Sequence, residues 1–118
     1  MNVEELREYC LNKKGATEDF PFDEETLVFK VMGKIFALVP LEKIPLQVNL
    51  KCDPGLAFEQ REKYETVQPG YHMNKKHWNT VIIDGSVRRN LILQWIDHSY
   101  DLVVKGLSTK QKEELRRI

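Results

Sequence analysis

Hydrophobic and polar positions alternate along this chain with two different periods, so the sequence predicts both helices and strands. One helical stretch runs from the first residues to about Lys14, with Asn2 placed to cap it and Gly15 placed to end it. The longest helical stretch covers residues 87–105 and ends at Gly106. Its apolar stripe consists of Leu91, Ile92, Trp95, Ile96, Ser99, Leu102 and Val103.

A period of two residues marks the middle of the chain as sheet. Residues 45–51 show it most clearly, with Leu46, Val48 and Leu50 on the face expected to be buried. Two earlier runs flank Gly33-Lys34, and a glycine in the first of two turn positions is typical of a tight hairpin. The predicted strands cover residues 27–32, 35–39, 45–51, 65–68 and 78–83.

Cap and turn residues complete the order of elements. Asp53 and Pro54 are placed as the cap and the first residue of a second helix. Residues 17–25 combine a proline with an acidic run, which predicts an irregular or edge segment. Ser108 and Gln111 form a capping box for a last short helix, whose remainder is expected to be solvated and partly frayed.

The element order α-β-β-β-α-β-β-α predicts an α+β fold on an antiparallel sheet. The 118 residues suit a single domain, with a core at about 1–107 and a helical tail at 108–118. No apolar run reaches the roughly 20 residues of a membrane span, and the acidic start does not resemble a signal peptide. We therefore expect a cytoplasmic protein with no membrane partner. Cys10 and Cys52 lack metal-site spacing, which predicts reduced, partly buried thiols.

The charges sum to zero, which argues against indiscriminate nucleic-acid binding. Their distribution along the chain is uneven. Residues 1–29 hold three basic and eight acidic side chains, whereas residues 30–118 hold fifteen basic and ten acidic ones. The two segments thus carry −5 and +5, and they form a charge dipole if the fold places them on different faces.

The stretch "PGYHMNKKHWNTV", residues 69–81, concentrates the candidate chemistry. Lysines neutralise phosphates, aromatic rings stack on bases, and asparagine amides read base edges. Lysines elsewhere in the predicted sheet can join them in one groove, and Arg88 stands at a helix N-terminus, where a cation suggests an anionic partner. The residues that these arguments single out for binding nucleic acid are Lys30, Lys51, Tyr71, His72, Asn74, Lys75, Lys76, His77, Trp78 and Arg88.

Catalytic and metal-binding readings of the same stretch find less support. His72 and His77 are five residues apart, and no third ligand lies between them, so we expect neither a metal nor another cofactor. A histidine acting as an acid or base needs a partner, which only the fold can supply from Asp53, Asp84 or Ser99. No nucleophile elbow or phosphate loop is present, so the protein is expected to be non-enzymatic.

A purely structural interpretation remains open beside these. Alternation puts Trp78, Thr80 and Ile82 on one face of a strand and Asn79, Val81 and Ile83 on the other, and either face can be the core. For Trp78 alone, packing in the core is the favoured role. Lysines within strands also protect sheet edges, which explains Lys30 and Lys51 equally well.

Several short motifs of this sequence resemble those of the MmcQ/YjbR family: "FPF" at 20–22, "FKVMGKIFAL" at 29–38, "KCDP" at 51–54, "PGYHMNKKHWNTV" at 69–81 and "SYDLV" at 99–103. The resemblance spans nearly the whole chain apart from the C-terminal "STKQKEELRRI". It implies a small α+β domain with a topology like that of type III secretion chaperones. It also implies DNA binding through a "double-wing" arrangement.

Two functional hypotheses follow. The first is a non-enzymatic DNA-binding protein that contacts phosphates through a basic and aromatic surface. The second is a module that binds a protein or a small anionic ligand in a groove roofed by residues 71–78. In either case the chain is expected to be a monomer or a homodimer.

Overall fold

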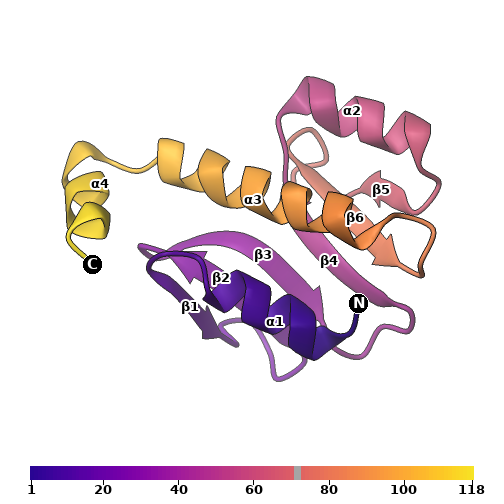
Figure 1. Ribbon diagram of the computed structural model, residues 1–118, viewed down its shortest axis with the longest axis horizontal. Helices are drawn as coiled ribbons and strands as arrows, with labels where there is room; N and C mark the ends of the chain where they lie inside the picture. Colours follow the sequence, from indigo (N-terminus) through magenta and orange to yellow (C-terminus); the bar gives the residue numbers. More distant parts are fainter. Residues whose placement is uncertain (71–72) are drawn as a thin grey trace.

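A six-stranded antiparallel sheet forms one layer of the molecule, and helices cover one of its faces (Figure 1). The computed structural model describes residues 1–70 and 73–118. Along the chain the elements are α1 (Val3–Leu11), β1 (Ala16–Asp19), β2 (Thr26–Val31), β3 (Lys34–Pro40), β4 (Leu46–Lys51), α2 (Pro54–Lys63), β5 (Val67–Pro69), β6 (Trp78–Ile83), α3 (Arg89–Lys105) and α4 (Thr109–Arg116). In the sheet the strands lie in the order β1-β2-β3-β4-β6-β5, which confirms the predicted α+β class.

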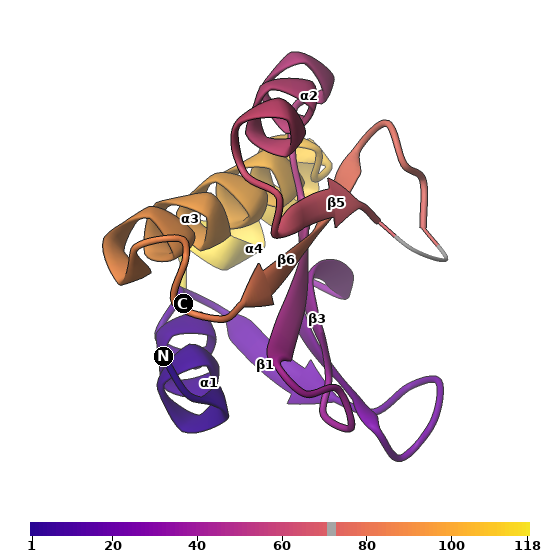
Figure 2. The same ribbon diagram turned by 90° about the vertical axis from the view of Figure 1, so that its right-hand side faces the viewer.

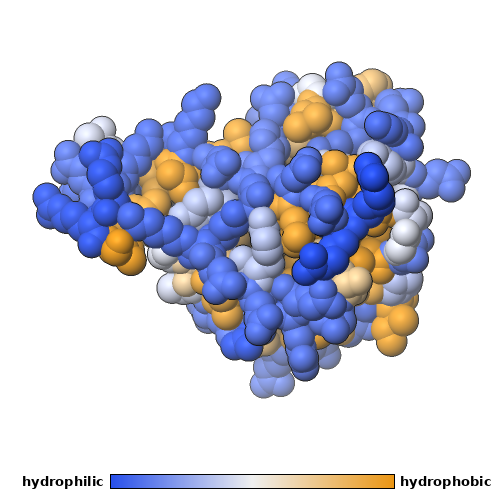
Figure 3. Space-filling view, viewed as in Figure 1, coloured by the Kyte–Doolittle hydropathy of each residue, from blue (hydrophilic) through white to orange (hydrophobic). Residues whose placement is uncertain are grey.

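The hydrophobic core lies between the sheet and helices α1 and α3. The two long apolar stripes read from the sequence supply most of it, since Leu6, Ile92 and Ile96 are fully buried against Phe29 and Phe36 of the sheet. Helix α3 crosses β2, β3 and β4, whereas α2 packs on β5 and β6. Figure 3 shows that the outer surface on this helix-covered side is mainly hydrophilic, with apolar side chains in separate groups.

The structure decides which face of β6 is the core. Asn79, Val81 and Ile83 point to the helices and are buried. Trp78 therefore lies on the opposite face and is only half-buried, so the favoured assignment of this residue to the core is wrong. Sequence alternation alone could not decide this, because each face of the strand carries both apolar and polar residues.

The β2–β3 hairpin turns one residue earlier than predicted. Val31 pairs with Lys34, so the two turn residues are Met32 and Gly33, with φ angles of 50° and 78°. Two positive φ values define a type I′ turn, in which glycine takes the second position. Met32 accepts the left-handed conformation because this turn matches the right-handed twist of the two strands.

Helix α1 ends at Leu11, before the predicted stop at Gly15. The residues between them form a turn that α3 holds in place: Asp97 forms an ion pair with Lys13, and the Tyr100 hydroxyl donates a hydrogen bond to the Lys14 carbonyl oxygen at 2.6 Å. Asp97 also accepts a hydrogen bond from the Tyr9 hydroxyl at 2.7 Å. The turn is thus set by contacts distant in sequence, which local signals cannot report.

The structure contains two elements, β1 and α4, that the predicted order of elements did not include. The acidic segment begins with the short edge strand β1, which pairs with β2 and confirms the edge prediction. Helix α4 has the predicted capping box, with the Ser108 side chain accepting from the Gln111 N–H at 3.1 Å. It is not a frayed tail, however, because Leu115 is buried against the core. Among the described residues, no helix is long and apolar enough to cross a membrane.

Both cysteines are free and buried. Burial raises the pKa of the Cys10 thiol to about 12 and that of the Cys52 thiol to about 11. Both thiols are therefore protonated at neutral pH and unreactive as nucleophiles.

A single buried hydroxyl group joins α3 to two strands. The Ser99 side chain donates to the Phe36 carbonyl oxygen at 2.6 Å and accepts from the Lys51 N–H at 2.9 Å. Phe36 sits in a β-bulge, since Lys30 pairs with Ile35 and the next pair joins Phe29 to Ala37. The Ser99 hydroxyl thus provides a hydrogen-bond partner for the carbonyl group at the bulge in β3 and for the N–H of the last residue of β4.

We predict that Ser99→Ala lowers the free energy of unfolding by about 2–4 kcal/mol, because it leaves two buried backbone groups without a partner. Ser86→Ala is the matched control, since that hydroxyl is exposed and its partners are the side chains of Thr66 and Asp84 rather than buried backbone groups. Urea unfolding of both variants measures the difference. An equal, small effect of the two substitutions would show that Ser99 has no special role.

Candidate functional site

The face of the sheet turned away from the helices carries polar side chains. A row of opposed residues crosses all six strands on this face. We call this surface the open face, and its central row consists of Asp19, Val28, Leu38, Asn49, Thr80 and Gln68. At its centre the Thr80 hydroxyl donates a hydrogen bond to the Asn49 side-chain oxygen. Figure 2 shows that two segments project from the sheet on this side, residues 20–25 after β1 and residues 73–77 before β6.

These loops enclose a groove with a volume of about 910 Å³. Its floor comes from β3, β4 and β6, including Leu38, Asn49 and Thr80. One wall is formed by Phe22, Asp23, Glu42 and Lys43, and the other by Gln68, Pro69, Met73 and Lys75. The volume falls in the range of sites for small molecules.

One end of the open face carries the cations. In the register of β4 and β6, Lys51 lies directly opposite Trp78, so the two side chains leave neighbouring strands on the same face of the sheet. Lys75 and Lys76 follow in the exposed turn that precedes Trp78. We call Lys51, Lys75 and Lys76 the basic end. None of the ion pairs found in residues 1–70 and 73–118 involves them.

Backbone and amide contacts hold this turn. The Asn74 side-chain oxygen accepts from the Lys76 N–H at 2.9 Å, and its carbonyl oxygen accepts from the Trp78 N–H at 2.9 Å. Arg61 of α2 donates to the Lys75 carbonyl oxygen at 3.1 Å. The Asn74 oxygen is thus used by the turn itself, which reduces its capacity to read a base edge.

Helix α2 is in turn fixed to β6 by a buried amide pair that the sequence did not reveal. The Asn79 side-chain nitrogen donates to the Gln60 side-chain oxygen at 3.2 Å and to the Ala57 carbonyl oxygen at 3.3 Å. Both amides are more than nine-tenths buried. A polar residue in a strand with alternating polarity is usually taken to face solvent, so the burial of Asn79 was not predicted. One sign of it was present in the sequence: Asn79 lies on the same face of the strand as the apolar residues Val81 and Ile83.

The opposite end of the open face is acidic. The loops 20–25 and 41–45 meet there, where the Leu41 N–H donates to the Glu25 carbonyl oxygen at 2.8 Å. We call Asp23, Glu24, Glu25 and Glu42 the acidic end. Hydrogen bonds from the N–H groups of Glu25 and Thr26 lower the pKa of Asp23, which keeps it ionised. The carboxyl group of Glu25 shares a hydrogen bond with Glu42, which raises its pKa.

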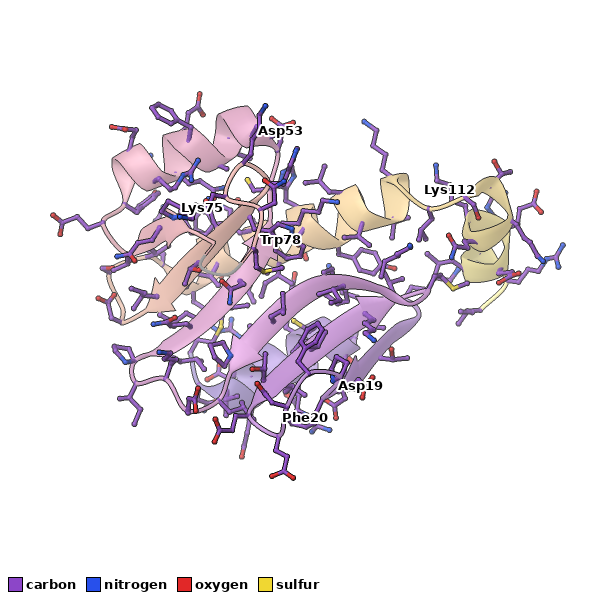
Figure 4. All side chains as sticks on the ribbon, turned by 180° about the vertical axis from the view of Figure 1, so that it is seen from behind. Asp19, Phe20, Asp53, Lys75, Trp78 and Lys112 are labelled. Atoms are coloured by element: carbon purple, nitrogen blue, oxygen red, sulfur yellow. The ribbon has the colours of Figure 1, made fainter. Side chains whose placement is uncertain are left out.

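The remaining predicted site residues are dispersed. Lys30 is two strands away from Lys51, and its Nζ lies 3.6 Å from Asp19 Oδ2. Arg88 occupies the N-cap position of α3 without a capping hydrogen bond from its side chain, and it follows the far end of β6, where Ile83 pairs with Leu46. The structure therefore does not bring these two to the basic end. Figure 4 shows Lys75 and Trp78 on the same part of the open face, away from Asp19 and Phe20. The candidates Tyr71 and His72 lie outside the described residues.

The other histidines have structural contacts. The His77 carbonyl oxygen accepts from the Cys52 N–H at 2.7 Å, and His98 Nε2 accepts from the Asp53 N–H at 3.3 Å. Asp53 occupies the cap position of α2 as predicted, although its side chain makes no capping hydrogen bond. Within the described part of the chain, no group of three or more His, Cys, Asp or Glu residues is arranged to hold a metal ion.

The family model described as YjbR matches residues 11–102. The chain belongs to the YjbR family. Among curated relatives, YbdF of Escherichia coli O157:H7 is 40% identical over 98 residues, which are 82% of this chain and 80% of that protein. YjbR of E. coli strain K12 is 35% identical over 115 residues, 98% of each chain. Both relatives are described as uncharacterized proteins.

Solved structures of two other proteins share the fold of this chain. The crystal structure of Deinococcus radiodurans protein DR2400 is 42% identical, with a TM-score of 0.90, over 97% of this chain and 87% of that one. A Pseudomonas syringae protein is 31% identical, with a TM-score of 0.74, over 86% of this chain and 98% of its own. The sheet and the helices that position the open face are thus shared with these proteins.

We predict that Gly70→Ala destabilises this YjbR-family protein by about 1–3 kcal/mol, because an added methyl group overpacks the site. Its Cβ would lie 2.8 Å from Trp78 Cβ and 3.0 Å from the Trp78 carbonyl oxygen. The indole should shift as well, which tryptophan emission would detect.

Gly55→Ala in α2 is the control for this substitution. The nearest atom to its added Cβ is Asp53 Oδ2 at 3.7 Å, an ordinary contact. If Gly70→Ala leaves both stability and emission unchanged, the close approach of the loop to Trp78 is not a constraint.

Proposed function

We propose that this protein binds DNA as a single strand along the open face, with its basic end neutralising phosphates and Trp78 stacking on a base. The observation that carries this proposal is the Lys51–Trp78 pair on adjacent strands, next to Lys75 and Lys76. A cation beside an aromatic ring on an exposed sheet is the arrangement that proteins use for single strands.

The placement of the helices favours a single strand over a duplex. Direct readout of duplex DNA commonly places a helix or a two-stranded ribbon in the major groove. Here α1 and α3 are packed on the covered face of the sheet, and the open face is a groove between loops. Amide side chains on its floor, such as Asn49 and Gln47, are positioned to bond to unstacked bases.

The contact is expected to be short and weak. Three lysines at the basic end neutralise at most about three phosphates, which predicts a slope near −2 when log affinity for a single strand is plotted against log salt. The acidic end prevents the strand from continuing along the whole groove. Little sequence preference is expected, because stacking and phosphate contacts are insensitive to base identity.

We predict that Lys75→Glu/Lys76→Glu lowers affinity for a labelled oligothymidylate at least tenfold at 50 mM salt and brings the slope below about 1 in magnitude, since two phosphate contacts are lost. Fluorescence anisotropy across a salt series measures both quantities. Lys110→Glu/Lys112→Glu is the matched control, because it makes the same charge change in α4, far from Lys75 (Figure 4). The proposal fails if the wild-type protein shows no salt-sensitive binding.

Tryptophan emission tests the stacking contact separately. Trp95 is buried in the core, so quenching by DNA reports on Trp78. Trp78→Ala should abolish the quenching and weaken binding about fivefold to a hundredfold, the range expected for one base stacked on an aromatic ring. Quenching that persists in this variant would contradict the stacking role.

A second candidate function, binding of a small anionic ligand or a peptide, is favoured by the groove itself. Its volume of about 910 Å³ and its amide-lined floor suit such a ligand, with Lys75 at one wall. The two functions differ in salt dependence. Binding through amides in an enclosed groove changes little with salt, whereas binding to a DNA backbone weakens steeply.

A further inference from the structure

The open face carries opposite charges at its two ends. The acidic end lies at the loop that leads into β4 at Leu46, and the basic end includes Lys51, the last residue of that strand. No carboxylate of the acidic end takes part in an ion pair found among the described residues. The loops 20–25 and 41–45 contain a single cation, Lys43, against four carboxylates. Within residues 1–70 and 73–118, the charges of neither end are therefore paired in a salt bridge.

The acidic end also contains two carboxyl groups held against each other. Glu25 and Glu42 share a hydrogen bond, and the ionised Asp23 lies in the same loop as Glu25. Ionising both groups at once is unfavourable unless a cation approaches them, because the two negative charges repel each other. The ammonium groups of a basic end are the complementary partner.

Apolar side chains surround the acidic end. Ile44 is 96% exposed and Phe22 is 65% exposed, and Phe20 and Leu41 of the same two loops are also exposed. Exposed apolar side chains rimmed by charges mark a protein contact surface. Phe22 forms part of the groove wall, so this apolar surface is continuous with the open face.

A surface with one acidic and one basic end is complementary to a second copy of itself after a two-fold rotation. Rotation places each acidic end on the basic end of the other molecule, so that both contacts are attractive. Aligning the two copies in the same direction places like charges together. The net charge of zero adds no long-range repulsion between the copies.

We propose that two copies of this chain associate through their open faces as a two-fold symmetric dimer, with each acidic end on the partner's basic end. The carboxylates then occupy the place that phosphates take in the proposed function. Dimerisation and DNA binding therefore exclude each other, and DNA binding is regulated by protein concentration. The dimer itself does not depend on DNA binding, whereas this regulatory consequence rests on the proposed function.

Reciprocal charge reversal tests the dimer. Lys75→Glu/Lys76→Glu changes the net charge of the basic end from +3 to −1, and Glu25→Lys/Glu42→Lys changes that of the acidic end, with Lys43 included, from −3 to +1. Each variant alone then brings like charges together, so it should dimerise at least tenfold more weakly than wild type. An equimolar mixture should regain a heterodimer, because each altered end now meets its opposite. Sedimentation velocity at 50 mM salt measures all four samples.

The wild-type protein supplies a readout that does not depend on the variants folding. Its dimer should dissociate at least tenfold more readily at 500 mM salt than at 50 mM, because the contacts are between exposed charges. A wild type that stays monomeric at millimolar concentration and low salt overturns the proposal. A dimer that persists in both variants, or folded variants that do not associate when mixed, overturns it as well.

The acidic-end variant separates the two proposals. It keeps the basic end, so it should bind the labelled oligothymidylate at least as tightly as wild type. If it neither dimerises nor binds the oligonucleotide, the DNA proposal fails while the dimer stands. If it binds DNA and still dimerises like wild type, the dimer proposal fails alone.

Discussion

The position of the candidate site depends on one buried hydroxyl group. Ser99 of α3 is fully buried. Its hydroxyl bonds to the carbonyl group at the bulge in β3 and to the N–H of the last residue of β4. The N–H that it accepts from belongs to Lys51, the residue opposite Trp78. The contact that attaches the long helix to the sheet therefore also fixes the strand end from which the basic end is built. An alanine at this position would also pack against the sheet, but it would leave the carbonyl group at the bulge and the N–H at the strand end without hydrogen-bond partners.

A second chain of contacts fixes the turn on the other side of the basic end. The buried amide of Asn79 holds α2 through Gln60, and Arg61 of the same helix bonds to the Lys75 carbonyl oxygen. Cys52, between β4 and α2, donates its N–H to the His77 carbonyl oxygen. The backbone of the turn that bears the surface lysines is thus held by hydrogen bonds to α2 and to the segment between β4 and α2. Such preorganisation lowers the entropy cost of binding.

The sequence predicted the elements better than it predicted their contacts. Apolar periods placed α3 and β6 to within two residues, because a stripe or an alternation is a local property of the chain. The Met32-Gly33 turn was misplaced by one residue, since its register is decided by pairing between strands. Loops tied by distant side chains, such as the turn at Lys13, leave no local signal at all. For the candidate site, the segment around Lys75 was identified, but the roles of Lys30 and Arg88 depended on strand order and register, which alternation does not encode.

The net charge of zero is a weaker objection to polyanion binding than it first suggests. What matters is the distance between opposite charges compared with the distance over which salt screens them. The six residues of β4 separate the two ends, and five residue steps at about 3.3 Å span roughly 17 Å. This is about twice the screening length of roughly 8 Å at physiological salt. Each end therefore acts on its surroundings almost independently. A phosphate near Lys75 responds to the lysines and hardly to Glu42, so a neutral protein retains a local site for an anion and, on the same face, a local site for a cation.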